Sequence, residues 1–176
     1  NGGSPAEKIM LCGDSAGGNL ALMLAAWSGE ATGRKADAVV AICPSTDMTL
    51  SSPTILGHRK QDKMLGQSIG SLGLIPHSIR LWISAVLMRA NPSNPLVSPL
   101  FQDLSDLPPT LIHASSNEIL LGEANRYANK ARVSGSDVTM QVWENQIHDW
   151  HLFNMGHGSA NEAWKEIECF LSTHFV

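Results

Sequence analysis

The sequence predicts an α/β fold with a mainly parallel sheet and flanking helices. Short apolar runs alternate with longer stretches rich in alanine, leucine and other helix formers, an order typical of strand–helix–strand units. Most of these runs are apolar at successive positions, as expected of strands that are buried on both faces. The length of 176 residues and the hydrophobic share of 43% suffice for one domain with a sizeable core.

Four apolar runs are predicted as strands, and glycine or proline marks the ends of most of them. Gly13 ends the first run, Pro44 ends the second, and Pro108 and Pro109 precede the third, while the fourth shows polar–apolar alternation. The strands cover residues 8–12, 36–43, 110–115 and 138–144. Helices are predicted over residues 15–27, 123–134 and 160–170, with a glycine shortly after each of the first two.

A long, proline-rich segment separates the second and third strands. It covers residues 45–108 and includes a predicted helix over 79–89, so it is too long for a simple crossover. Segments of this kind commonly form lids or binding loops. We expect the part at about 46–90 to be a cap-like insertion whose Trp82 and Met88 bind substrate. The alternative is an ordinary helix with irregular packing around it.

Composition argues against several classes of protein. The 12 lysines and arginines against 16 aspartates and glutamates give a net charge of −4, which disfavours a nucleic-acid partner. No apolar run approaches the roughly 20 residues of a membrane span. The three cysteines, Cys12, Cys43 and Cys169, have neither disulfide-framework nor zinc-knuckle spacing. We expect reduced thiols and a cytoplasmic protein.

One motif carries chemistry, and it lies between the first predicted strand and the first predicted helix. It is the G-x-S-x-G match Gly13-Asp14-Ser15-Ala16-Gly17. A serine on so tight a turn has a strained backbone and an exposed hydroxyl, and we expect both flanking glycines to be required because a Cβ would collide there. Ser15 is therefore the predicted nucleophile, and the Ala16 N–H the predicted oxyanion donor. The alternative is that Ser15 only caps a helix.

A serine nucleophile needs a general base, and the base needs an acid that orients it. In this kind of site the order along the chain is serine, acid, histidine. The loop after the last strand carries His148, the first choice for the base, and His151, the second. Glu118 is the only ionisable group in the loop after the third strand and is the predicted acid; its alternative role is to complement a helix dipole. His148 and His151 have no fitting third ligand, so no metal is predicted, and Asp149 is expected to hold a backbone group.

With these positions identified, the sequence resembles the hormone-sensitive-lipase-like family of α/β-hydrolase esterases over nearly its whole length. The resemblance implies that Ser15 is the nucleophile, Glu118 the acid and His148 the base of an ester hydrolase that uses no metal or cofactor. Its apolar insertion favours small-molecule esters with short to medium acyl chains. The matching segments are residues 13–21, 94–100, 107–110, 117–121 and 146–150.

The sequence departs from the family pattern at three places. Glu118 stands where the family often has aspartate, and Gly122 stands where it usually has an acidic residue, which is expected to loosen the following helix start. The His-Gly-Gly-Gly oxyanion segment that the family places well before the serine is not among these residues. Residues 1–176 are therefore interpreted as the C-terminal portion of a single catalytic domain, weak or inactive by itself.

Two partners are expected from this interpretation. One is the N-terminal half of the same protein, and the other is a second copy that pairs through the strand at 138–144. The alternative function is a non-catalytic, receptor-like ligand-binding member of the same fold, as in the gibberellin receptors of plants, which lack a working triad. The presence of His148 favours the enzyme. A serine peptidase or thioesterase is the other rival.

Overall fold

A parallel four-stranded sheet forms the centre of the computed structural model, which describes residues 6–153 and 158–174. The strands lie side by side in chain order, and every neighbouring pair is parallel. They are β1 (Met10–Asp14), β2 (Ala38–Ile42), β3 (Thr110–Ser115) and β4 (Val138–Trp143). The predicted α/β fold class is confirmed, and all four predicted strands are present with ends within two residues of those expected.

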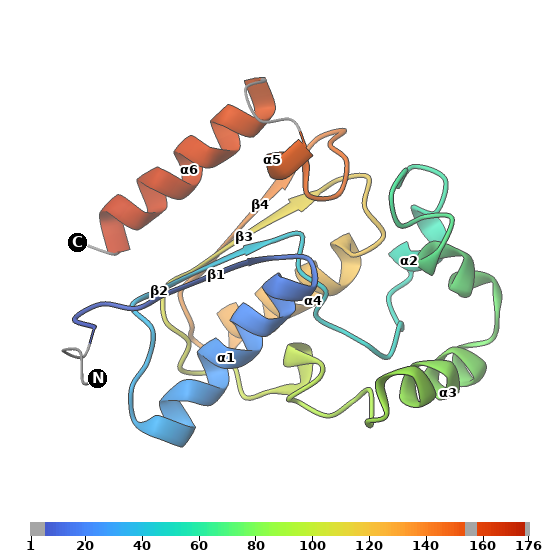
Figure 1. Cartoon of the computed structure of the whole chain (residues 1–176), viewed down its shortest axis with the longest axis horizontal. Coiled ribbons are helices and arrows are strands. Elements are labelled where there is room, and N and C mark those ends of the chain that lie inside the picture. The colour runs from blue at the N-terminus through green and yellow to red at the C-terminus, as the bar shows by residue number, and fades with distance from the viewer. Residues whose placement is uncertain (1–5, 154–157, 175–176) are drawn as a thin grey trace, which may run out of the picture.

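Helices cover both faces of the sheet, as Figure 1 shows. Helices α1 (Ala16–Thr32) and α4 (Leu121–Val133) pack on one face, and α6 (Gly158–His174) packs on the other, where the short α5 (Trp150–Phe153) also lies. The side chains of β2 alternate between the two layers: Val39 and Ala41 join the core under α1 and α4, while Val40 and Ile42 join the core under α6. Burial on both faces explains why this strand is apolar throughout.

The segment between β2 and β3 first runs beyond the carboxyl ends of the strands and then returns along α1 and α4 to the start of β3 (Figure 1). It contains α2 (Thr54–Gly57), α3 (His77–Met88) and two 3₁₀ turns, η1 (Ile69–Leu74) and η2 (Pro99–Phe101). The predicted helix over 79–89 is therefore present as α3. This segment stands next to the loops that carry the predicted catalytic residues, which is where a cap would be needed.

The outer strand β1 is much less buried than the strands inside the sheet. Its residues alternate between exposed and half-buried, whereas all five residues of β2 are buried. All three cysteines are free. Within residues 6–153 and 158–174, no helix has the length and apolar character that crossing a bilayer requires.

Candidate active site

Ser15 lies on a strained turn between β1 and α1. Its φ is +50°, a region that non-glycine residues rarely adopt. Three backbone bonds hold the turn. The Ser15 N–H donates to the carbonyl of Ile42 at 2.8 Å, and the Ser15 carbonyl accepts from the N–H of Asn19 at 3.1 Å and from that of Ser45 at 3.3 Å. The expected strain at the serine is thus confirmed, and the bond to β2 fixes the serine against the sheet.

Of the two motif glycines that flank Ser15, only the first is required to be glycine by its surroundings. A Cβ on Gly13 would overlap the backbone of Gly17, so the first motif glycine has no room for a side chain. A Cβ on Gly17 would meet nothing closer than Asp14 Oδ1 at 3.9 Å, so the expected collision there is wrong for this chain. The crowded position is instead Gly18, where a Cβ would lie 2.9 Å from Pro44 Cβ because α1 crosses close over the end of β2.

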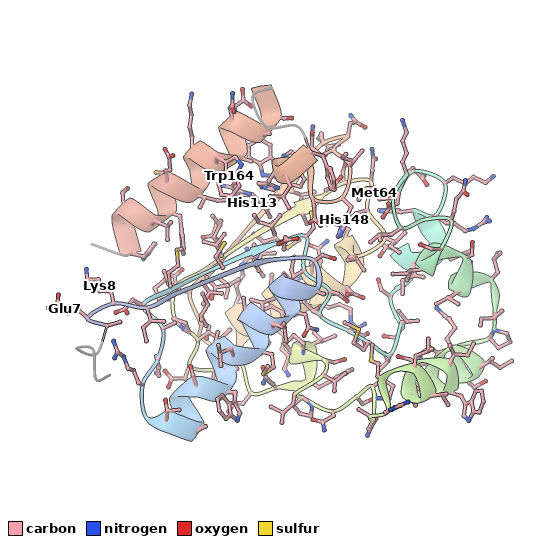
Figure 2. All side chains as sticks on the ribbon, in the orientation of Figure 1. Glu7, Lys8, Met64, His113, His148 and Trp164 are labelled. Carbon is pink, nitrogen blue, oxygen red and sulfur yellow. The ribbon has the colours of Figure 1, made fainter. Side chains whose placement is uncertain are left out.

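The three predicted catalytic residues meet at the carboxyl edge of the sheet. His148 Nδ1 lies 2.9 Å from Glu118 Oε2, and His148 Nε2 lies 2.9 Å from Ser15 Oγ. The residues come from the loops after β1, β3 and β4, and Figure 2 labels His148 at that end of the molecule. Glu118 and His148 are buried, while Ser15 is half-buried. Parallel strands bring their carboxyl ends to one edge, which is why residues so far apart in sequence converge.

Glu118 is held by its own loop and by the insertion. Its Oε1 accepts from the N–H of Ser115 at 3.0 Å, and its backbone carbonyl lies 3.0 Å from His58 Nδ1. The next residue, Ile119, donates its N–H to Asp62 Oδ2 at 3.0 Å. The insertion therefore clamps the acid loop, a role for His58 and Asp62 that sequence reasoning missed because 57 to 60 positions separate the partners.

Gly122 does not loosen the start of α4, contrary to expectation. Its N–H donates to Thr54 Oγ1 at 3.1 Å, and the same hydroxyl donates to the carbonyl of Ile119 at 2.7 Å. A Cβ at Gly122 would lie 2.7 Å from Thr54 Oγ1 and would overlap the Ser52 hydroxyl. The small residue therefore lets the insertion approach the helix closely enough to hold it.

Glu123, in the first turn of α4, is a second buried acid near the site. Its Oε1 accepts from the N–H of Thr46 at 2.8 Å and lies 3.4 Å from the N–H of Asp47, while its Oε2 has no hydrogen-bond partner among the described residues. Burial raises the pKa of Glu123 to about 8 despite these bonds. Glu123 thus ties α4 to the chain that leaves β2, and it lies outside the hydrogen-bonded series that ends at Ser15.

Asp149 contacts His148, the predicted base, rather than only a backbone group. Its Oδ2 lies 3.1 Å from His148 Nε2, the same nitrogen that faces Ser15. Burial lowers the pKa of His148, but the hydrogen bonds to the Asp149 and Glu118 carboxylates and their negative charges outweigh burial and raise this pKa to about 10. The site therefore binds a proton on His148 strongly.

The other predicted site residues are placed less centrally. Ala16 is the first residue of α1, where helical N–H groups lack an intrahelical partner and can meet an oxyanion. Trp82 lines an open hollow on α3 together with Ala85 and Arg89, and the residues that line this hollow do not include the triad. Met88, at the end of α3, places its sulfur 3.8 Å from Ser84 Oγ. The substrate-binding roles of Trp82 and Met88 stay predictions.

His151, the second choice for the base, lies in the core under α6. Its Nε2 lies 2.9 Å from Nδ1 of His113, and both rings are fully buried. Three tryptophans surround this pair at ring distances of 4.0 to 6.4 Å; they are Trp143, Trp150 and Trp164. A histidine in this position cannot reach Ser15, so His148 is the base that the geometry favours.

Within the part of the chain that the structure describes, one group of side chains has the spacing of metal ligands. Ligand atoms of Cys43, Glu118 and His148 all lie within 4.8 Å of one another. Two of the three already bind each other, and burial raises the pKa of the Cys43 thiol well above its usual value. A neutral thiol is a poor metal ligand, so these side chains suit proton transfer better than metal binding.

Comparisons with known proteins identify the fold family of the chain and several of its relatives. A profile described as the α/β-hydrolase fold matches residues 1–152. An esterase of Acinetobacter venetianus is 29% identical over 167 residues, which are 95% of this chain and 52% of the esterase. The carboxylesterase/phospholipase LipF of Mycobacterium tuberculosis is 32% identical over 173 residues, which are 94% of this chain and 43% of LipF.

Solved structures of similar fold also belong to esterases. A crystal structure of an esterase from the bacterial hormone-sensitive lipase family matches with a TM-score of 0.81 and 28% identity, covering 96% of this chain and 54% of that one. An esterase/lipase from an uncultured bacterium matches with a TM-score of 0.79 and 28% identity, covering 94% of this chain and 52% of that one. The chain spans about half the length of these relatives. By the profile it belongs to the α/β-hydrolase fold family, and in sequence and fold it is similar to an esterase of the bacterial hormone-sensitive lipase family.

Proposed function

We propose that this chain is the C-terminal portion of a serine carboxylic-ester hydrolase that acts on small-molecule esters with short to medium acyl chains. The observation that carries the proposal is the unbroken series from Glu118 through His148 to Ser15, with both links at 2.9 Å. The names of the relatives, esterase and carboxylesterase/phospholipase, support the same reaction class.

The reaction proceeds by two acyl-transfer steps. Neutral His148 accepts the hydroxyl proton of Ser15 through Nε2 while Ser15 Oγ attacks the ester carbonyl, and Glu118 stabilises the imidazolium that forms. The imidazolium then donates this proton to the leaving alcohol, which leaves an acyl group on Ser15. In the second step His148 takes a proton from water as the water oxygen attacks the acyl group. The bond between the acyl carbon and Ser15 Oγ then breaks, the imidazolium returns its proton to Ser15 Oγ, and the acid departs.

The Ala16 N–H is the oxyanion donor that this chain supplies. We expect further donors from the N-terminal half of the same protein, as the hormone-sensitive-lipase-like family implies. Loss of one oxyanion donor typically costs about 10²–10³ in rate. The 176 residues by themselves are therefore expected to hydrolyse esters slowly or not at all.

A covalent probe tests the nucleophile. The protein expressed from its complete gene is treated with a fluorophosphonate, and peptide mass spectrometry locates the adduct. We expect the adduct on Ser15 and its loss in Ser15→Ala. Ser45→Ala is the matched control, because Ser45 lies in the neighbouring loop and its hydroxyl faces the sulfur of Met48. An adduct on another serine, with Ser15 unmodified, would refute the assignment.

A substrate panel tests the reaction class. The same protein is assayed with p-nitrophenyl esters of increasing acyl length, with thioesters and with amides. The proposal predicts the highest kcat/KM on short or medium esters. Preference for amides or thioesters would point to the peptidase or thioesterase rival. Ligand binding without turnover of any of the three would favour the receptor-like alternative.

A further inference from the structure

His148 Nε2 faces two oxygens where catalysis uses one. Ser15 Oγ lies 2.9 Å away, and Asp149 Oδ2 lies 3.1 Å away. Because Nδ1 faces Glu118 Oε2 at 2.9 Å, Nδ1 carries a proton, and Nε2 presents either a lone pair or a second proton. A lone pair that faces a carboxylate oxygen at 3.1 Å is repelled, whereas an N–H at that distance donates a charge-assisted hydrogen bond. The contact therefore belongs to the protonated imidazolium.

The backbone around Asp149 holds its carboxylate in this place. Asp149 has a φ of +54°, which directs the chain from His148 into α5. Its carbonyl accepts from the N–H of Leu152 at 2.9 Å, and its N–H points at the sulfur of Cys43 at 3.5 Å. The side chain is 9% exposed, and its Oδ1 has no partner among the described residues. A buried carboxylate that accepts few hydrogen bonds is stabilised strongly by a cation beside it.

The groups that face His148 come from each loop around it. Glu118 comes from the loop after β3, and Asp149 from the loop after β4. Cys43 follows β2, and burial keeps its thiol neutral by raising its pKa. Ser15 follows β1 and is uncharged. Two carboxylates thus favour the proton on His148, with Glu118 at Nδ1 and Asp149 at Nε2.

We propose that Asp149 is a positioning residue that holds His148 in a protonated resting form. On this view, which rests on the proposed function, the Nε2 proton must pass to a solvent base and the Asp149 carboxylate must leave Nε2 before Ser15 can donate its own proton there. The pH at which the enzyme becomes active is then set by Asp149. The acid limb of its pH–rate profile therefore lies at higher pH than the acid limb of a Ser–His–Glu site that lacks this carboxylate.

The pH dependence of kcat/KM tests this, measured on the protein from its complete gene as wild type, Asp149→Asn and Asp149→Gly. Asparagine keeps the shape without the charge, and glycine adopts the positive φ without strain. Both variants are expected to move the acid limb to lower pH by about one to three pH units. Asp106→Asn is the matched control, because it removes one charge from a side chain that is 79% exposed and pairs with Lys35. A loss of activity without movement of the limb would overturn the proposal.

A second measurement does not depend on ester hydrolysis. NMR titration of the His148 ring in Ser15→Ala and in Ser15→Ala/Asp149→Asn reports its protonation directly. The proposal predicts that the ring in Ser15→Ala stays protonated to higher pH than in the double variant. Equal titration in both would overturn the role of Asp149 even if esters are cleaved. A shifted titration with no cleaved ester at any pH would support the Asp149 contact and refute the proposed function.

Discussion

Glu118 has one methylene more than the aspartate that the resembling family often carries, and the site uses both of its oxygens. One oxygen accepts from the Ser115 N–H, which anchors the carboxylate to its own loop, and the other meets His148 Nδ1. The anchored carboxylate both selects the tautomer with the proton on Nδ1 and offsets the charge of the imidazolium. Asp149 cannot replace it, because its Oδ2 lies at the opposite ring nitrogen.

Replacing Glu118 by glutamine is expected to keep the fold and reduce kcat about 10⁴-fold, the loss typical of an orienting carboxylate that becomes an amide. Steady-state kinetics on a p-nitrophenyl ester measure the loss, and a thermal melt checks the fold. Glu118→Asp is the matched variant, since it keeps the charge and should retain more activity than the amide. Near-normal turnover in Glu118→Gln would contradict the assignment of the acid.

At the scale of elements, α3 is attached to the chain that leaves β2. Ser84 Oγ donates to the carbonyl of Met48 at 2.6 Å, and Arg80 Nη1 donates to the carbonyl of Leu50 at 2.7 Å. The outer face of α3 carries apolar side chains in solvent, and Trp82 is 67% exposed. So large an exposed indole is available to contact a substrate or a covering segment.

Trp82→Ala is expected to change the preference for acyl length more than the turnover of acetate esters. The assay is a series of p-nitrophenyl esters on the protein from its complete gene. Leu87→Ala provides the matched control, because Leu87 is also on α3 and is 76% exposed. If Trp82→Ala lowers activity equally at all acyl lengths, the side chain stabilises the packing of the insertion and does not select substrates.

β3 and α5 are joined by the buried pair His113 and His151. The outer nitrogens of the pair, His113 Nε2 and His151 Nδ1, have no partner among the described residues. Burial lowers the pKa of His113 to about 4, and burial with the neighbouring ring lowers that of His151 to about 3. Both rings are therefore neutral in the folded protein at pH 7.

This pair predicts acid sensitivity of the fold. Histidines in the unfolded chain have a pKa near 6.5, so below that pH the unfolded state binds more protons than the folded state. The contribution of the two neutral histidines to the free energy of unfolding is therefore complete above about pH 6.5. It is lost as the pH drops towards 4, by an amount on the order of several kcal/mol.

Urea denaturation between pH 7.5 and 4 measures the effect. His113→Asn/His151→Gln is expected to flatten the fall, because its side chains do not titrate in this range. His77→Gln serves as the control, since His77 is exposed at the start of α3. An equally steep fall in the double variant would contradict the prediction.

At the scale of the whole molecule, both outer strands present an open edge. β1 pairs only with β2 among the described residues, and its Met10 is 40% exposed. An exposed apolar edge strand tends to pair with another chain. Since the chain spans about half of its relatives, we propose that the N-terminal half of the same protein covers β1.

The 176 residues alone are therefore expected to aggregate, as measured by size-exclusion chromatography with light scattering. Co-expression with the gene segment that precedes them should give one defined species. Met10→Lys is expected to reduce the aggregate, because an edge lysine opposes pairing. Val133→Lys, on α4 at 90% exposure, is the matched control. A monomer of the wild-type chain that melts cooperatively would contradict the need for a covering half.

A homodimer through residues 138–144 is the corresponding prediction for the opposite edge. Val142 on β4 is 43% exposed. In the protein from its complete gene, Val142→Lys is expected to convert a dimer to a monomer by placing like charges across the contact, while Val133→Lys leaves the mass unchanged. A dimer that survives Val142→Lys would place its interface elsewhere.

The sequence by itself determined the order of strands and helices and predicted which serine, acid and histidine lie together. Local signals sufficed there: Gly13 and Ser15 mark a strand-to-helix turn, and Glu118 and His148 are placed by the loops that follow strands. Since parallel strands end at one edge, loop position already implies proximity.

Only the tertiary structure decided which neighbours these residues have. The bond of Asp62 to the acid loop and the bond of Thr54 to the first turn of α4 join positions 57 and 68 residues apart. The contact of Asp149 with His148 Nε2 depends on a positive φ, and the burial of His151 depends on how α5 packs under α6. Such contacts are set by close packing between elements and not by local pattern, and they control the proton affinity of the base.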